Sequence, residues 1–229
     1  VKQQLRHLRD RLLCERQLKA GRFSAVVANS GNANACTGPQ GARDAEAMRD
    51  RLARLIGRPA SEVFVASTGV IGRRLPISKV LAGIPEAFRV LSPKGGKASA
   101  QAIMTTDTYP KEAAVTFELE GKRVVIGGMA KGSGMIAPNL ATMLCFVGTD
   151  AAVPAALLRR TLRPAVRDTF NAITVDGCMS TNDTVLLFAN GGAGAPPVRA
   201  GTSNLAVFEE ALHRVLSGLA RLIAKDGEG

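Results

Sequence analysis

A predicted β-hairpin near the middle of the chain restricts the fold more than any other feature of the sequence. Two stretches rich in β-branched and apolar residues, 113–119 and 123–126, are separated only by Glu120, Gly121 and Lys122. So short a connection joins antiparallel neighbours, because parallel strands need a crossover of a dozen or more residues. The hairpin therefore argues against a purely parallel sheet.

Helices and further strands are predicted on both sides of the hairpin. Short apolar runs predict strands at residues 23–28, 61–66, 102–106, 142–147, 172–175 and 184–189. Amphipathic patterns predict helices at residues 3–20, 43–56, 76–84, 153–170 and 208–225. Gly57 is expected to close the second of these helices, and Pro164 to kink the fourth or end it early. This mixture of elements predicts an α/β fold.

The chain of 229 residues carries a formal net charge of +11, which makes anionic partners worth considering. Its arginines are spread over several predicted helices, at positions where a helix faces water. The chain has one Tyr and no Trp, so a nucleic-acid site built on base stacking has few candidate residues. We therefore expect a solvated basic surface and no nucleic-acid partner.

The cysteines and the apolar runs indicate in which cellular compartment the protein is expected. Four cysteines are widely spaced and form no CxxC pair, which argues against both a zinc site and a disulfide framework. Reduced thiols are typical of a cytosolic protein. No apolar run has the length that spans a bilayer. We therefore expect a cytoplasmic protein without a metal ion and without a membrane partner.

A glycine-rich segment surrounds Lys131, directly after the hairpin. Residues 132–137 match the dinucleotide-binding pattern GxGxxA, but that pattern must open a long helix and Pro138 falls where the helix should continue. Nucleotide binding is therefore disfavoured. In a loop of small residues the ammonium group of Lys131 can reach a substrate carboxylate, although a lysine in a surface turn gives the same pattern.

Thr142 begins the apolar run that follows this segment. A threonine becomes a good nucleophile when the peptide bond before it is cut, because the freed α-amine is an adjacent base with a pKa near neutrality. Such a device needs no histidine, and the chain has only two. Threonine is also an ordinary strand former, so the residues around Thr142 leave both interpretations open.

Six separated blocks of the sequence, in order, resemble one protein family. The blocks are residues 29–38, 67–72, 105–111, 128–144, 180–183 and 225–229. They contain the strings NSGNANA, STGVIG, TTDT, the run from Gly128 to Leu144, STND and KDGEG. Together they resemble the ornithine acetyltransferase, or glutamate N-acetyltransferase, family of arginine biosynthesis. Residues 1–12 match poorly, and chains of this family extend beyond both ends of this one.

The resemblance implies a fold and a processing event. The fold would be α/β, with stacked mixed β-sheets flanked by helices, similar to the N-terminal nucleophile hydrolases. Residues 1–229 would form a single partial catalytic domain. Family precursors cut themselves, here between Ala141 and Thr142, so residues 1–141 would correspond to most of an α chain and residues 142–229 to the first part of a β chain. Two copies of each chain would assemble into a heterotetramer.

The resemblance also implies an activity and the residues that perform it. The family moves an acetyl group from N2-acetylornithine to L-glutamate through an acetyl-threonine, so Thr142 would be the nucleophile. Thr68 and Gly69 match the pair that forms the oxyanion hole. The matching substrate-binding positions are Thr105, Lys131, Thr142 and Glu228. No cofactor is implied; some members also accept acetyl-CoA as a donor, and the sequence leaves open whether this protein does.

Two other functions use the same observations differently. A self-processing aminopeptidase or amide hydrolase would use Thr142 in the same way, with water as the acceptor of the acyl group. A basic binding module without catalysis would need only the positive charge.

Overall fold

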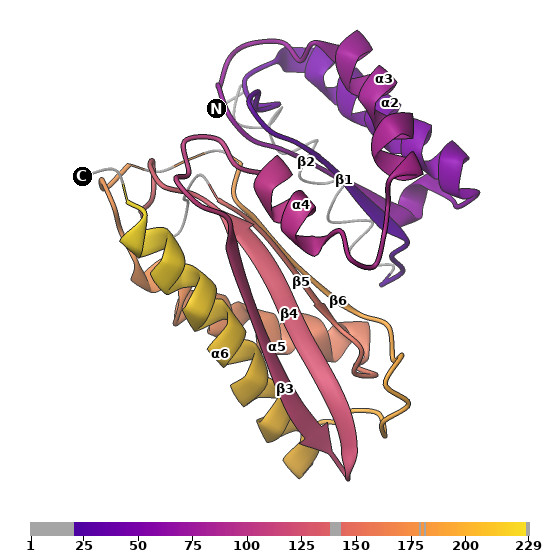
Figure 1. The fold of residues 1–229 in the computed structure, drawn as a ribbon, viewed down its shortest axis with the longest axis vertical. Helices are drawn as coiled ribbons and strands as arrows, with labels where there is room; N and C mark the ends of the chain where they lie inside the picture. Colours follow the sequence, from indigo (N-terminus) through magenta and orange to yellow (C-terminus); the bar gives the residue numbers. More distant parts are fainter. Residues whose placement is uncertain (1–20, 138–142, 179, 181, 228–229) are drawn as a thin grey trace. The chain divides into compact units, whose positions relative to one another are not determined.

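The computed structural model describes residues 21–137, 143–178, 180 and 182–227 (Figure 1). The chain divides into two compact units, Val1–Gly95 and Gly96–Gly229. Each unit has a hydrophobic core of its own. That residues 1–229 form a single partial catalytic domain stays a prediction.

The first unit is a parallel pair of strands covered by helices. Strands β1 (Ala25–Asn29) and β2 (Val63–Ser67) pair in parallel. Between them run helix α2 (Gly38–Ile56) and the short 3-10 helix η1 (Ala60–Glu62), and α3 (Ile77–Arg89) follows β2. The unit's core contains the wholly buried side chains of Met48 and Val63. This unit thus brings the carboxyl ends of β1 and β2 to the same edge.

Two helix boundaries in this unit confirm the predictions. Helix α2 ends at Gly57, whose φ of 63° is left-handed and whose N–H caps the carbonyl groups of Ala53 and Arg54. Pro76 is the residue before α3 and has no N–H to leave unsatisfied. Helix α2 begins five residues earlier than predicted, at Gly38.

The second unit is built on a mixed sheet with the order β3-β4-β5-β6. Its strands are β3 (Lys111–Leu119), β4 (Lys122–Lys131), β5 (Leu144–Thr149) and β6 (Thr184–Ala189). Strands β3, β4 and β5 are antiparallel, whereas β5 and β6 are parallel. The predicted hairpin is confirmed: Leu119 pairs with Lys122, and Glu120 and Gly121 both have positive φ, as a two-residue type I′ turn requires.

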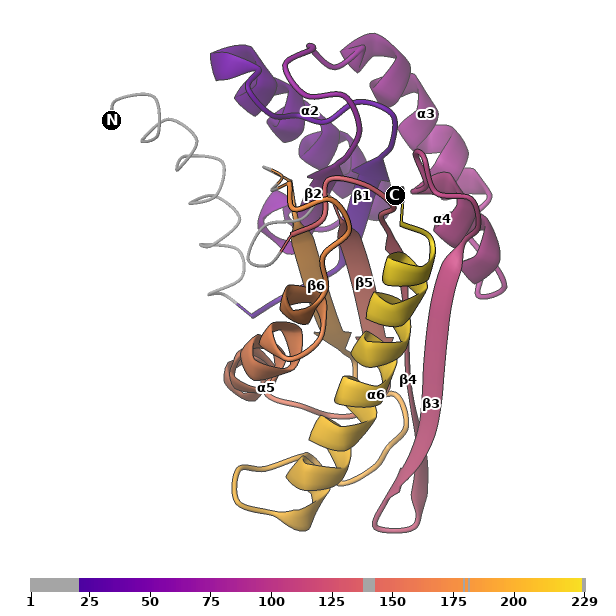
Figure 2. The ribbon, with the colours of Figure 1, turned by 90° about the vertical axis from the view of Figure 1, so that its left-hand side faces the viewer.

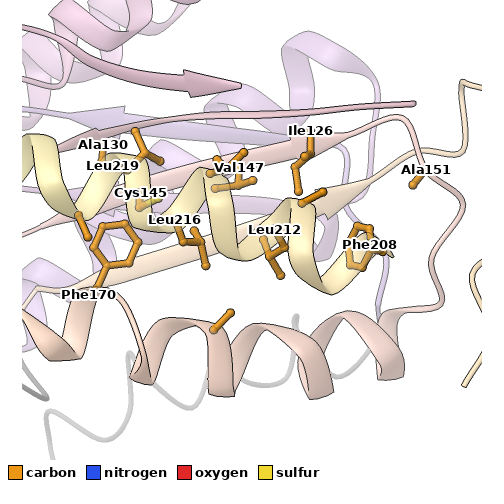
Figure 3. Packing of buried hydrophobic residues seen from close by; sticks show 14 of the residues in the cluster. Ile126, Ala130, Cys145, Val147, Ala151, Phe170, Phe208, Leu212, Leu216 and Leu219 are labelled. Carbon is orange, nitrogen blue, oxygen red and sulfur yellow. The ribbon is translucent and has the colours of Figure 1, made fainter. Parts of the chain in front are cut away.

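Helices cover this sheet on the side of its apolar residues. Helix α6 (Ser203–Lys225) contacts β3 and β4, and helix α5 (Ala155–Arg167) lies beside it (Figure 2). Figure 3 shows Leu212, Leu216 and Leu219 of α6 in the same buried cluster as side chains of the strands. The strand side chains that meet them include Ile126, Ala130, Cys145 and Val147, all wholly buried. Burial of this face fixes β4 and β5 against α6.

Two predicted strands are absent from the described residues. Residues 102–106 form no strand; helix α4 (Gly96–Ala102) ends there, because residues 96–102 are mostly good helix formers and the apolar run after them is short. Residues 172–175 form no strand, since the 3-10 helix η2 (Phe170–Ala172) takes up their start. Of the two effects expected of Pro164, the early end does not occur, because helix α5 continues to Arg167; a kink stays a prediction. Its buried residues Leu157, Thr161 and Ala165 have helical spacing, so packing maintains the last turn.

The predicted helix at residues 3–20 lies outside the described residues. Within the described ranges, no helix is long and apolar enough to cross a membrane.

Leu216→Ala tests the packing of α6 on the sheet. Leu216 is wholly buried, so its truncation should lower the free energy of unfolding by about 2–5 kcal/mol. Urea denaturation followed by circular dichroism measures the change. Val207→Ala is the control on the same helix: Val207 is 37% exposed and should change stability by less than about 0.5 kcal/mol. Equal losses for the two variants would contradict the packing described.

Candidate active site

Lys131 lies at the end of β4, where the glycine-rich segment begins. Its side chain is 2% exposed, so the interpretation as a lysine in a surface turn is wrong. Nζ donates a hydrogen bond to Oγ1 of Thr105 at 2.7 Å and lies 4.0 Å from Oδ2 of Asp107. The structure therefore brings two of the predicted substrate-binding residues, Thr105 and Lys131, into direct contact. No helix begins within residues 132–137, so the segment lacks the helix that a dinucleotide-binding loop requires.

Asp107 connects the two backbone segments that carry Thr105 and Lys131. Its carboxylate accepts the N–H of Gly132 at 2.6 Å, the N–H of Thr105 at 3.0 Å and Nζ of Lys111 at 2.7 Å. Burial opposes ionisation of Asp107, but the hydrogen bonds from Gly132 and Lys111 outweigh it and hold its pKa below the usual range. Asp107 is therefore a carboxylate that fixes the backbone next to both substrate-binding candidates.

Lys111 joins this carboxylate to the end of α6. Its side chain is wholly buried, with Nζ 2.7 Å from Asp107 and 2.5 Å from Oδ2 of Asp226. Asp226, directly after α6, also accepts the N–H of Thr108 at 3.0 Å and the hydroxyl of Thr108. Close by, the Tyr109 hydroxyl donates to the carbonyl of Leu222 at 2.8 Å. The segment before β3 is thereby fastened to the carboxyl end of α6.

We call Asp107, Lys111, Lys131 and Asp226 the buried ion network. Burial opposes ionisation of Asp226, but hydrogen bonds from Lys111 and Thr108 hold its pKa below the usual range. Two ammonium groups and two carboxylates make the network neutral overall. A buried charge is tolerated only when it is paired and hydrogen-bonded. All four residues lie within the family blocks, but only Lys131 had a predicted role; nothing in the sequence assigned one to Asp107, Lys111 or Asp226.

Asp183 lies just before β6 and holds the start of β5. Its Oδ1 accepts the N–H of Met143 at 2.9 Å, whereas its Oδ2 is buried and has no hydrogen-bond partner among the described residues. Burial raises the pKa of Asp183 to about 7, although the Met143 N–H and the charge of Lys131 act in the opposite direction. The parallel register, with Leu144 opposite Thr184, explains why residues 143 and 183 are neighbours. No sequence argument gave Asp183 a role.

Thr68 and Gly69 follow β2 in the first unit. The N–H of Thr68 donates to the carbonyl of Asn29 at 3.1 Å, which ties the residue after β2 to the end of β1. Gly69 has a φ of 128°, and a Cβ there would lie 2.2 Å from the carbonyl carbon of Gly31. Only glycine fits this position. Its N–H has no hydrogen-bond partner within the described part of the chain.

The loop after β1 contacts the loop that contains Gly69. Asn32 and Val70 form an isolated parallel bridge, and the Gly72 N–H donates to the carbonyl of Ala35 at 3.0 Å. These contacts hold the loop after β1 alongside the backbone that carries Gly69. The predicted positions Ala141, Thr142 and Glu228 lie outside the described residues, and the assigned roles of all these residues stay predictions.

Comparisons with known proteins agree with the expected family. The model of the ArgJ family matches residues 11–229. The arginine biosynthesis bifunctional protein ArgJ of Symbiobacterium thermophilum is 56% identical over 218 residues, which are 95% of this chain and 54% of that protein. Its counterpart in Caldanaerobacter subterraneus is 52% identical over 211 residues, 92% of this chain and 52% of that protein. This chain thus spans about half the length of these curated relatives.

A solved structure supports the fold. The crystal structure of the arginine biosynthesis bifunctional protein ArgJ from Bacillus halodurans superposes with a TM-score of 0.52 at 41% sequence identity. The superposition covers 59% of this chain and 70% of that one. The predicted α/β fold class is confirmed.

Lys111→Met tests the buried ion network. Removal of the ammonium leaves two buried carboxylates without their shared partner, which should lower the free energy of unfolding at pH 7 by about 3–5 kcal/mol. The loss should shrink as the pH falls toward about 4, because protonation neutralises the two carboxylates. Arg89→Met is the control, since its ion pair with Glu86 is exposed and should contribute less than about 1 kcal/mol. A Lys111→Met loss as small as that of the control would contradict the network's importance.

Asp183→Asn tests the burial of this carboxylate, in a Thr142→Ala background so that no cleavage interferes. The folded-state pKa of about 7 exceeds the ordinary value of 3.8, so the folded chain binds this proton more tightly than the unfolded chain. Asp183 therefore does not destabilise the fold below about pH 4, and its destabilising effect grows as the pH rises to about 7. Between about pH 5 and 8, the free energy of unfolding of the Asp form should fall by on the order of 1–2 kcal/mol relative to that of the Asn variant. This figure allows for the partial exposure of the carboxylate. Urea titrations that show a pH-independent difference would contradict the assigned burial.

Proposed function

Because the chain belongs to the ArgJ family, we propose that the complete protein moves an acetyl group from N2-acetylornithine to glutamate. The observation that carries the proposal is the buried contact of Lys131 with Thr105, at two positions that match substrate-binding residues of the family. The name of the relatives, arginine biosynthesis bifunctional protein, supports the same pathway.

Lys131 suits the carboxylate of an amino-acid substrate. A lysine ammonium is a compact point charge, and here Thr105 and Asp107 hold it in one place. Glu228 suits the δ-ammonium group of ornithine. The residue two positions before it, Asp226, is bound to Lys111, so the ion network holds the end of α6 as well as the backbone around Lys131.

The proposed reaction begins with cleavage of the Ala141–Thr142 bond. The Thr142 hydroxyl then attacks the acetyl carbonyl carbon of N2-acetylornithine, and its proton moves to the freed α-amine of Thr142. The Thr68 hydroxyl and the Gly69 N–H donate to the oxyanion that forms. When the carbon–nitrogen bond breaks, ornithine takes the proton from the α-ammonium and leaves, and an acetyl ester remains on Thr142.

Glutamate completes the cycle. Its neutral α-amino group attacks the ester, Thr142 regains its hydroxyl proton, and N-acetylglutamate leaves. The cycle needs no cofactor, and acetyl-CoA would enter only as a second acetyl donor. We further propose that the complete protein works in the cytoplasm as two copies each of the α and β chains.

Thr142→Ala tests the nucleophile by intact mass spectrometry of the complete protein. Wild type should give two fragments divided between Ala141 and Thr142, whereas the variant should stay whole, because alanine lacks the hydroxyl that attacks the preceding carbonyl. Thr116→Ala is a matched control on the exposed face of β3 and should be cut like wild type. An uncut wild type with full activity would contradict the mechanism.

Product analysis separates this function from its rivals. With both N2-acetylornithine and glutamate present, the processed protein should form N-acetylglutamate. Release of acetate alone would identify an amide hydrolase. A protein that is not cut and forms a salt-sensitive complex with nucleic acid would instead be a basic binding module.

A further inference from the structure

One carboxylate oxygen of Asp183 has no partner in the described part of the chain. Oδ2 of Asp183 is buried and accepts no hydrogen bond there, while Oδ1 of the same carboxylate accepts the N–H of Met143 at 2.9 Å. Buried polar atoms in folded proteins are nearly always hydrogen-bonded, and an exception calls for an explanation. We therefore expect a hydrogen-bond donor, absent from the described residues, to lie within reach of this oxygen.

Covalent geometry limits the distance from this carboxylate to the α-nitrogen of Thr142. The nitrogen of Met143 is bonded to the carbonyl carbon of Thr142, and three bonds separate it from the nitrogen of Thr142. With ordinary bond lengths these two nitrogens lie roughly 2.7–3.7 Å apart for every rotation of the backbone. A carboxylate that binds the first nitrogen through one oxygen can therefore reach the second through its other oxygen.

We propose that Oδ2 of Asp183 binds the α-amino group of Thr142 that cleavage creates, which makes Asp183 the positioning residue for the base of the reaction. This inference rests on the proposed function, because the amino group exists only after the Ala141–Thr142 bond is cut. Before cleavage, the nitrogen of Thr142 is a neutral amide with a single N–H. After cleavage, it is an amine or ammonium that offers further donors and a charge.

The chemistry of the proposed cycle suits such a partner. As the Thr142 hydroxyl attacks, its proton moves to the α-amine and an ammonium forms. A carboxylate that stays ionised beside it stabilises this charge by a charge-assisted hydrogen bond. The same contact turns the lone pair of the amine toward the hydroxyl. A carboxylate plays the corresponding part beside the histidine of a Ser-His-Asp triad, where it orients the base without taking the proton.

Lys131 is the other positive group that acts on Asp183. Its Nζ donates to Thr105 and lies 4.0 Å from Asp107, and it donates no hydrogen bond to Oδ2 of Asp183. A role of Asp183 as a counter-ion of Lys131 alone predicts the same behaviour before and after cleavage. A role beside the α-amine predicts a change on cleavage, and this difference can be measured.

The first experiment needs no substitution at Asp183. The pKa of its carboxyl group can be measured by carbon NMR in protein labelled with carbon-13 aspartate, once in the uncut Thr142→Ala form and once in the processed wild type. The signal is assigned by its loss in Asp183→Asn. We expect the pKa to fall by about 1–3 units on cleavage, because an ammonium within hydrogen-bond distance favours the charged carboxylate. An unchanged pKa would overturn the proposal and leave Asp183 as a counter-ion of Lys131.

The second experiment follows kcat against pH in the processed protein. Asp183→Asn removes the negative charge, so the α-ammonium loses its proton more readily and the acid limb of kcat should move to lower pH by about one unit. The plateau of kcat should fall by roughly tenfold or more, since the new ammonium is less stabilised, while KM for N2-acetylornithine stays within about threefold.

Asp150→Asn is the matched control for the second experiment. Its carboxylate also holds a strand N–H, that of Val125 at 2.8 Å, but it lies after the far end of β5. Its acid limb and plateau should equal those of wild type. An Asp183→Asn protein that loses activity with an unmoved acid limb would show a purely structural role and overturn the proposal. A wild type that is never cut would overturn the proposed function, and this inference with it.

Discussion

The geometry of the second unit depends on one wholly buried ammonium group, that of Lys111, held between two carboxylates. It lies 2.7 Å from Asp107 and 2.5 Å from Asp226, and those residues belong to the segment before β3 and to the end of α6. Removing a charge from water is costly, and only close pairing with further hydrogen bonds compensates for it. Here the backbone N–H groups of Thr105, Thr108 and Gly132 supply those bonds. The pairing thus fixes three separate backbone segments at once.

The candidate site is built on this fixed framework. Lys131 reaches Thr105 because Asp107 holds the backbone next to each of them. A neighbouring part of the same sheet carries Asp183, whose single hydrogen bond to Met143 leaves one buried oxygen without a partner in the described residues. The carboxylates of the ion network are hydrogen-bonded, while the Asp183 carboxylate has capacity for another donor. We therefore assign a structural role to the ion network and a chemical role to Asp183, although both lie in the same unit.

Local sequence patterns predicted most elements but few of their interactions. The hairpin at Glu120 and Gly121 and the helix stop at Gly57 follow from turn chemistry within a few residues. The false strand at residues 102–106 arose because a short apolar run has the same composition in a strand and at a helix end. The ion network could not be predicted, since Lys111 and Asp226 are 115 residues apart. Family resemblance selected Thr105 and Lys131, whereas Asp183 became visible only through its burial and its pairing register.

The central claim is that Thr142 carries the acetyl group, and trapping of the acyl-enzyme tests it most directly. Processed protein is mixed with N2-acetylornithine in the absence of glutamate, quenched in acid, digested and sequenced by mass spectrometry. The account predicts one acetyl group on the peptide that begins with Thr142, held as an ester that hydroxylamine removes. An acetyl group found on another residue, or none on Thr142 while turnover proceeds, would contradict it.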